Sequence, residues 1–223
     1  MTVLDNEELK VEKLEIEIEN TRHITNTYII KNKKENTALV IDPAFNEKRI
    51  LESLAEYTLE KVVVTHSHAD HIAALAKLVE NVNTKVYIHK LDFEGLYKKE
   101  LNEEEIVGTK VLPVNKEKVI CVEDGEKITL GDLGFKVIHT PGHTSGSIVL
   151  YNEKNDILFA GDTIFESSYG RTDLVTGSKE QMGKSLDKLF SMLENTTVFS
   201  GHGRDFNLSD SKRKIRLLFA FKG

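Results

Sequence analysis

A cluster of metal-binding residue types directly follows a short apolar run and constrains the fold more than any other feature of the sequence. The run KVVVT (61–65) is rich in β-branched residues, which is typical of a buried strand. The positions that follow contain His66, His68, Asp70 and His71. In an extended chain the first two of these histidines point to the same side, and the other two residues lie beside them at the start of a helix. Because four ligands from one turn would crowd a single ion, the cluster indicates two neighbouring metal ions.

Three further candidate ligands occur where other predicted strands end. His143 follows a Pro-Gly turn in HTPGHTSGS, Asp162 follows the apolar run LFAG, and His202 lies between glycines in VFSGHG. Glycine lets the backbone turn sharply and approach a ligand closely. Chance placement does not explain this recurring pattern of apolar strand, tight turn and ligand residue. We therefore predict a metal centre built from the following residues: His66, His68, Asp70, His71, His143, Asp162 and His202.

The remaining histidines and the single cysteine receive structural interpretations. His23 and His89 are expected to be satisfied polar residues, and His139 is expected to lie behind the metal centre at most. Cys121 lies in the strand-like run VICVED, so we expect a buried and unreactive thiol. One cysteine cannot form an internal disulfide, which fits a reducing compartment.

Strand-like and helical patterns alternate along the chain, which indicates an α/β (α+β) fold. The run KLEIEIE (13–19) has the period of a half-buried strand, whereas segment 179–193 carries apolar residues at helical spacing. We find no repeats, no low-complexity tracts and no linker. The length of 223 residues suits one large domain or two small ones, and the interspersed elements favour a single domain over residues 1–223.

Composition and charge restrict the partners and the compartment. The net charge is −6, and the closest approach to a basic cluster, SKRKIR (211–216), is better interpreted as the solvated face of a terminal helix, so nucleic acid is not expected as a partner. No apolar run is long enough to cross a membrane, and the N-terminus lacks the apolar core of a signal peptide. We expect a cytoplasmic protein that acts on a small molecule and has no membrane partner. The sequence sets no oligomeric state.

Four motifs, in the order HSHADH, PGHTSGS, GDT and SGHG, resemble those of the metallo-β-lactamase fold superfamily. The resemblance extends from about residue 13 to the end of the chain. It is specific for the fold and much less so for the substrate, because this fold hosts many reactions. It implies a four-layer αββα sandwich with a metal site at one edge of its two sheets.

The resemblance also assigns the candidate ligands to two divalent metal ions, with zinc favoured and iron or manganese suited to the same residue types. The implied assignment is His66, His68 and His143 for the first ion, Asp70, His71 and His202 for the second, and Asp162 as a bridge between them. Asp42, in VIDP, would orient ligands through hydrogen bonds. An equally weighted alternative makes it a turn aspartate before Pro43.

A pair of metal ions implies hydrolysis by a bridging hydroxide. Ions about 3.5 to 4 Å apart lower the pKa of a shared water toward neutrality and polarise an acyl or phosphoryl oxygen. Asp70 would also orient this nucleophile. The segment TIFESSYGRTD resembles a stretch of small bacterial proteins related to hydroxyacylglutathione hydrolases (glyoxalase II), which implies an anionic thioester as the substrate.

The same resemblance suggests substrate-binding residues. In glyoxalase II a basic residue near this position holds a substrate carboxylate, and Arg171, with Tyr169 close by, occupies a comparable place. Alternatively, Arg171 pairs with Asp173. The chain ends soon after His202, without the helical C-terminal domain that helps glyoxalase II to bind glutathione, so a different thiol is an alternative.

Two other functions stay open. A persulfide dioxygenase of the same fold uses one iron and a His-His-Asp triad, which maps to His66, His143 and Asp162. Those enzymes usually carry aspartate where this chain has Gly203. A non-catalytic metal-binding module is less favoured, because seven ligands for two ions leave open coordination positions that a closed structural site lacks. We favour the thioester hydrolase.

Overall fold

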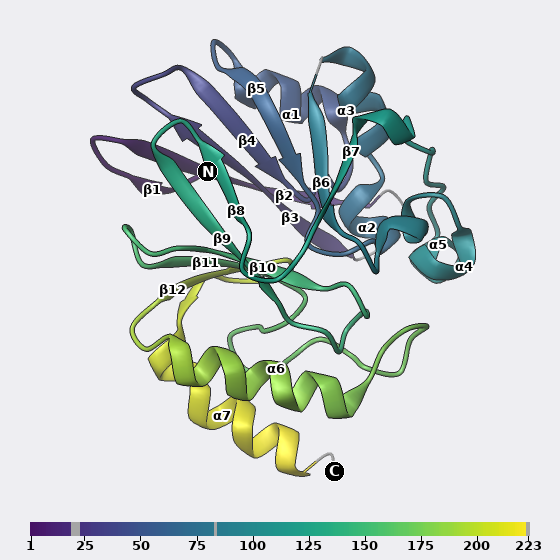
Figure 1. The fold of residues 1–223 in the computed structure, drawn as a ribbon, viewed down its shortest axis with the longest axis vertical. Helices are drawn as coiled ribbons and strands as arrows, with labels where there is room; N and C mark the ends of the chain where they lie inside the picture. Colours follow the sequence, from purple (N-terminus) through teal and green to yellow (C-terminus); the bar gives the residue numbers. More distant parts are fainter. Residues whose placement is uncertain (19–22, 83, 222–223) are drawn as a thin grey trace.

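The computed structural model describes residues 1–18, 23–82 and 84–221, which form two β-sheets packed face to face. Helices cover the outer faces of the sheets, so the layers follow the order helix, sheet, sheet, helix (Figure 1). This arrangement confirms the predicted four-layer αββα sandwich. Central strands such as β11 (Ile157–Gly161) are buried at every position, because both faces of their sheet are covered.

The first sheet contains seven strands in the order of the sequence. Its strands pair antiparallel from β1 to β4 and parallel from β4 to β7. Residues 13–17 of the strand predicted over 13–19 belong to β2, Ile18 follows the end of this strand, and residue 19 lies outside the described residues. The strands are β1 (Thr2–Asp5), β2 (Leu9–Glu17), β3 (Ile24–Asn32), β4 (Thr37–Ile41), β5 (Thr58–Val63), β6 (Lys85–His89) and β7 (Val119–Val122).

The second sheet contains six strands in the order β13-β12-β11-β10-β9-β8. Only β11 and β12 pair in parallel, and the long helix α6 provides the crossover that this connection requires. The remaining pairs are antiparallel. Besides β11, the strands are β8 (Lys127–Leu130), β9 (Leu133–His139), β10 (Ile148–Asn152), β12 (Thr197–Ser200) and β13 (Phe206–Asn207).

The helices bury apolar faces against the two sheets. The helix predicted over 179–193 is confirmed as α6, which follows Ser178 and buries Met182, Leu186 and Leu189. The Ser178 side chain accepts a hydrogen bond from the Gln181 N–H at the first turn, as N-cap residues commonly do. The helical elements are α1 (Glu47–Leu54), α2 (Ala69–Ile72), α3 (Leu75–Asn81), η1 (Phe93–Leu96), α4 (Lys99–Asn102), α5 (Glu104–Val107), η2 (Lys116–Lys118), α6 (Lys179–Met192) and α7 (Leu208–Phe221).

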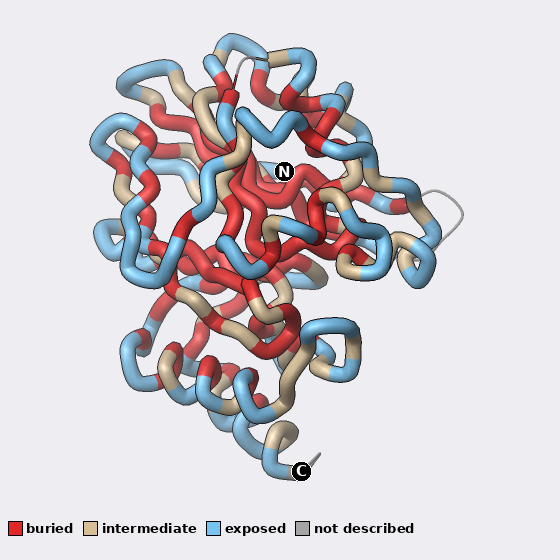
Figure 2. Tube along the Cα trace, turned by 45° about the vertical axis from the view of Figure 1, so that its right-hand side comes forward, coloured by how far each residue is buried: buried red, intermediate tan, exposed pale blue. Residues whose placement is uncertain are grey.

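An aromatic cluster fills the space between the sheets. Figure 2 shows that buried segments concentrate where the sheets face each other. Tyr28 from the first sheet lies with its ring 5.3 Å from Phe159 and 5.6 Å from Phe199 of the second. Burial of such large apolar side chains holds the sheets together, and with them the strand ends on which the candidate ligands lie.

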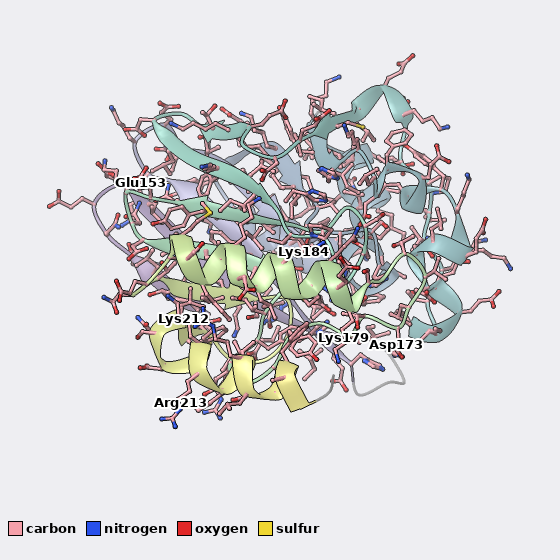
Figure 3. The ribbon with its side chains drawn as sticks, turned by 60° about the horizontal axis from the view of Figure 1, so that its bottom comes forward. Glu153, Asp173, Lys179, Lys184, Lys212 and Arg213 are labelled. Atoms are coloured by element: carbon pink, nitrogen blue, oxygen red, sulfur yellow. The ribbon has the colours of Figure 1, made fainter. Side chains whose placement is uncertain are left out.

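Two sequence interpretations concern the surface. Cys121 lies in strand β7 as predicted, but the expectation of a buried thiol is wrong, because β7 is an edge strand and Cys121 is exposed. The basic stretch SKRKIR belongs to α7, where Ile215 is buried whereas Arg213 and Lys214 are exposed. Figure 3 views this side of the molecule, with Arg213 labelled on α7. In the described part of the chain, no helix has the length and apolar character needed to span a bilayer.

Candidate metal centre

The seven predicted ligands meet at one edge of the sandwich, because they lie beyond the ends of four strands. The first four follow β5 and enter α2, and the others follow β9, β11 and β12. Their polar atoms form three overlapping groups, within each of which the candidate ligand atoms lie within 4.8 Å of one another. Among the described residues, the groups are His66, His68 and His143; His66, His71 and Asp162; and Asp70, His71 and His202. These clusters are consistent with a dinuclear metal site.

The candidate centre has two halves, which are His66, His68 and His143 on one side and Asp70, His71 and His202 on the other. Asp162 lies between them. Its Oδ1 is 3.3 Å from His71 Nε2, and its Oδ2 is 3.5 Å from His143 Nε2. The same Oδ2 is 3.4 Å from His202 Nε2. One carboxylate therefore faces ring nitrogens of both halves, which is the placement that a bridging ligand requires.

Several buried polar atoms of the cluster have no hydrogen-bond partner within the part of the chain that the structure describes. They are His66 Nε2, His68 Nε2, His71 Nε2 and Asp162 Oδ1. A buried polar atom without a partner costs about 1–3 kcal/mol, so a folded protein rarely gathers several of them in one place. Most of these atoms are of the kind that coordinate divalent ions, so the residues fit a metal centre.

In four histidines Nδ1 lies within hydrogen-bond distance of an oxygen, and the Nε2 of one of them, His143, lies 2.9 Å from His68 Nδ1. Each Nδ1 can donate to an oxygen, which fixes the tautomer and the direction of the ring. The pairs are His66 Nδ1 with Thr65 Oγ1 (3.1 Å), His71 Nδ1 with Asp42 Oδ2 (2.9 Å), His143 Nδ1 with the Arg171 carbonyl (2.8 Å) and His202 Nδ1 with the Ile24 carbonyl (2.6 Å). These contacts therefore fix the orientation of four imidazole rings around the centre.

The hydrogen bonds of Asp42 support the interpretation that this residue orients ligands. Its Oδ1 accepts from the Thr65 N–H at 2.7 Å, and its Oδ2 accepts from the Thr65 hydroxyl at 2.6 Å and from His71. The Thr65 hydroxyl in turn faces His66 Nδ1. Asp42 also has a left-handed backbone, with φ of 50°, before Pro43. The turn and the orienting role are thus properties of the same residue.

Electrostatics divide the centre into a neutral part and a charged part. Burial lowers the pKa of His68 to about 3 and that of His66 well below its usual value, so both imidazoles are neutral near pH 7. Burial also opposes protonation of His71 and His202, but the carboxylates of Asp70 and Asp162 raise the pKa of His71 to about 10, and chiefly Asp162 raises that of His202 to about 12. A divalent cation bound there would take the place of these protons.

Glycines allow the loops to close around the centre, a role that the sequence patterns did not single out residue by residue. A Cβ on Gly201 would lie 2.4 Å from Asp162 Oδ1 and 2.6 Å from His71 Cε1. A Cβ on Gly170 would lie 1.9 Å from the Asp162 carbonyl oxygen. Any side chain at these positions would displace the shared carboxylate or its loop. The signal in the sequence was the glycine that precedes His143, Asp162 and His202, as in PGH, AGD and SGH.

A pocket of about 420 Å³ opens onto the centre. Its lining consists of His143, Asp162, Phe165, Ser168, Gly170, Arg171, His202 and Gly203. The Arg171 side chain is 55% exposed and forms a two-pronged pair with Asp173, through Nε at 2.9 Å and Nη2 at 2.8 Å. This is the alternative that the sequence left open for Arg171. Figure 3 labels Asp173 on the loop before α6.

Tyr169 lies outside this lining, and its ring packs 5.2 Å from Phe219 of α7. Its predicted contact with a substrate therefore finds no support in the pocket geometry. His89 and His139 stack on each other with ring centroids 4.0 Å apart and belong to none of the three ligand groups. Burial is the main cause that lowers the pKa of His89 to about 4, and the neighbouring His139 is the second. His23 is exposed and is likewise outside these groups.

A comparison with protein families agrees with the geometry. The model of the metallo-beta-lactamase superfamily matches residues 20–202. The chain belongs to this superfamily. An uncharacterized protein of Aquifex aeolicus is 35% identical over 79% of this chain and 83% of its own length. The "Probable metallo-hydrolase YqgX" of Bacillus subtilis is 31% identical over 76% of this chain and 81% of its own. The hydroxyacylglutathione hydrolase GloC of Haemophilus influenzae is 25% identical over 80% and 86%, respectively.

Solved structures show the same fold. The BLEG-1 B3 metallo-beta-lactamase has a TM-score of 0.80 at 28% identity and covers 90% of this chain and 95% of its own. The protein TTHA1623, in a di-iron-bound form, has a TM-score of 0.80 at 27% identity and covers 92% of this chain and 99% of its own. The fold of this chain thus recurs in a metallo-beta-lactamase and in a di-iron-bound protein.

Proposed function

We propose that the protein is a metal-dependent hydrolase and that its substrates are small thioesters with an anionic acyl part. The observation that carries the proposal is the Asp162 carboxylate, which faces ring nitrogens of His71, His143 and His202 and lines an open pocket. A structural metal site is closed by protein ligands, whereas a catalytic site keeps open positions. The similarity to GloC supports a thioester as the substrate.

The metal ions would supply Lewis acidity and lower the pKa of water that they bind. His66, His68 and His143 would hold one ion, Asp70, His71 and His202 the other, and Asp162 both. Hydrolysis breaks the C–S bond, forms a C–O bond to the oxygen of water and leaves the proton on the thiol.

Asp70 is the proposed proton-accepting residue. Its Oδ2 accepts a hydrogen bond from the Thr25 hydroxyl at 3.1 Å and lies 3.2 Å from His202 Nε2. These contacts fix the carboxylate beside the second ligand group. In this position Asp70 can accept a hydrogen bond from the attacking water and so orient it. Asp70 can then take up the proton that the water gives up.

Arg171 is the proposed contact for the anionic part of the substrate. Its guanidinium lies at the rim of the pocket and uses Nε and Nη2 to bind Asp173. A guanidinium has five N–H donors, so Nη1 remains available for a carboxylate. Asp173 holds the side chain in place but also competes with an anionic ligand.

The dioxygenase alternative has less support from the geometry. It requires only His66, His143 and Asp162 around one ion, which leaves the group of Asp70, His71 and His202 without a role.

Elemental analysis of protein purified without chelator, followed by thioester assays, tests the proposal. We expect close to two metal equivalents per chain and hydrolysis of S-lactoylglutathione or another anionic thioester. The Arg171→Lys variant keeps the positive charge but lacks the two-pronged guanidinium, so it separates the effect of charge from that of geometry. One equivalent of iron, with oxygen consumption in the presence of a persulfide, would establish the dioxygenase instead. Protein that binds metal but hydrolyses no thioester would exclude the proposed substrate class.

A further inference from the structure

Asp92 is a buried carboxylate to which the sequence patterns gave no role. It follows strand β6 and precedes η1, and only 3% of its surface is exposed. Its backbone N–H donates to the His89 carbonyl at 2.9 Å, which anchors it to the end of β6. Buried aspartates need several hydrogen bonds or a cation to offset the loss of hydration. The hydrogen-bond partners of Asp92 therefore indicate which parts of the structure this side chain holds together.

These partners come from two loops that carry candidate ligands. Asp92 Oδ2 accepts from the Ser67 N–H at 3.0 Å and from the Thr144 hydroxyl at 2.7 Å. Its Oδ1 accepts from the Gly146 N–H at 2.7 Å. Ser67 lies between His66 and His68, and Thr144 directly follows His143. One carboxylate thus joins the two loops that supply the ligand group His66, His68 and His143.

The contact is tight and suited only to a carboxylate. A Cβ on Gly146 would lie 2.4 Å from Asp92 Oδ1, so the backbone approaches this oxygen more closely than any other residue type would allow. Three donors converge on the side chain, and a carboxylate offers acceptors alone. An asparagine would point its NH₂ group at a backbone N–H of one loop or the other. At least one loop would then lose its anchor.

The second half of the centre is held by other residues. His71 is bound by Asp42, and His202 is bound by the Ile24 carbonyl. Asn26 also donates to the carbonyls of Ser200 and Gly203 on either side of His202. None of these contacts involves Asp92. Loss of the Asp92 carboxylate should therefore affect one ligand group more than the other.

We propose that Asp92 is a positioning residue that sets the spacing between the His66–His68 loop and the His143 loop, and so the affinity of one of the two metal positions. The proposal rests on metal binding at this centre, which is part of the proposed function, but not on the identity of the substrate. Residues that support metal ligands through hydrogen bonds typically change metal affinity by 10- to 100-fold when they are replaced.

Chelator competition with the Asp92→Asn variant tests the proposal. We expect one of the two metal equivalents to bind more weakly by about 10- to 100-fold and the other to bind as in the wild type. The visible spectrum of the cobalt-loaded variant should differ from that of the wild type, because the ligand geometry changes. The control is Asp156→Asn, the same substitution at an exposed aspartate. Asp156 Oδ1 also accepts two side-chain hydrogen bonds, from Tyr151 and Thr196, but it precedes β11 at the end opposite Asp162.

Gly146→Ala tests the same contact without a change of charge. The new Cβ would push against Asp92 Oδ1, so we expect the same selective loss of one equivalent, and this variant decides the matter if Asp92→Asn does not fold. Wild-type affinity for both equivalents in these variants, or equal weakening of both, would overturn the proposal. A wild-type protein that binds no metal would overturn the proposed function as well.

Discussion

At the scale of single residues, Asp162 is the proposed shared ligand of the candidate centre. Its two oxygens lie 3.3 Å from His71 Nε2 and 3.5 Å from His143 Nε2. We expect Asp162→Ala to lose metal from both positions and to reduce kcat/KM by more than about 100-fold, since a ligand matters more than the residues that support ligands. Elemental analysis and steady-state kinetics measure both effects. Retention of metal and activity would remove Asp162 from the centre; the exposed Asp187→Ala on α6 is the control.

Arg171 has two parts with separate consequences. Its carbonyl accepts from His143 Nδ1, whereas its side chain lies at the pocket rim. We therefore expect Arg171→Ala to raise KM for anionic thioesters by up to about tenfold while metal content stays intact, because the guanidinium is 55% exposed and its ion pairs are screened by water.

Asp173→Asn is the complementary variant. It releases the guanidinium from its two-pronged pair, so KM for the same substrates should fall or stay equal. Initial rates measured over a range of concentrations of an anionic and of an uncharged thioester distinguish a lower KM from an equal one. An unchanged KM in Arg171→Ala would show that the side chain does not contact the substrate.

At the scale of elements, α6 links stability to the position of the His143 loop. Ser178 caps the helix through its side chain, and its N–H donates to the Gly142 carbonyl at 2.8 Å, next to His143. We expect Ser178→Ala to cost about 1 kcal/mol, which corresponds to a Tm lower by about 2–4 °C for a protein of this size. Ser191→Ala is the matched control within α6, because the Ser191 hydroxyl donates to the Lys188 carbonyl and caps nothing. Equal Tm values for the two variants would contradict the capping role.

At the scale of the whole molecule, the metal centre joins loops from both sheets, so bound metal should stabilise the complete sandwich. His66 and His71 follow strand β5 of the first sheet, whereas Asp162 follows β11 of the second. A ligand present at 100 times its Kd stabilises the folded state by about 2.7 kcal/mol. We expect chelator treatment to lower Tm by about 5–10 °C in the wild type and not in Asp162→Ala. Differential scanning calorimetry measures this, and an equal effect of chelator on both proteins would argue against a stabilising ion at this centre.

Local patterns in the sequence by themselves indicated an α/β fold and the set of candidate ligands, and the resemblance of four motifs to a known superfamily implied the four-layer sandwich. Alternation of apolar residues indicated β2, helical spacing indicated α6, and turn glycines next to histidines marked the strand ends. The same local reasoning was wrong for Cys121, whose exposure depends on β7 being the edge strand of its sheet.

Only the tertiary structure decided which loops meet and what holds them. The contacts of Asp92 with Ser67 and Gly146 join residues far apart in the chain, and no spacing rule relates them. The same is true of Tyr169, which packs on Phe219 of α7, and of the Ile24 carbonyl that orients His202. The order of strands in each sheet and the packing of the sheets set these distances, and both are properties of the folded chain as a whole.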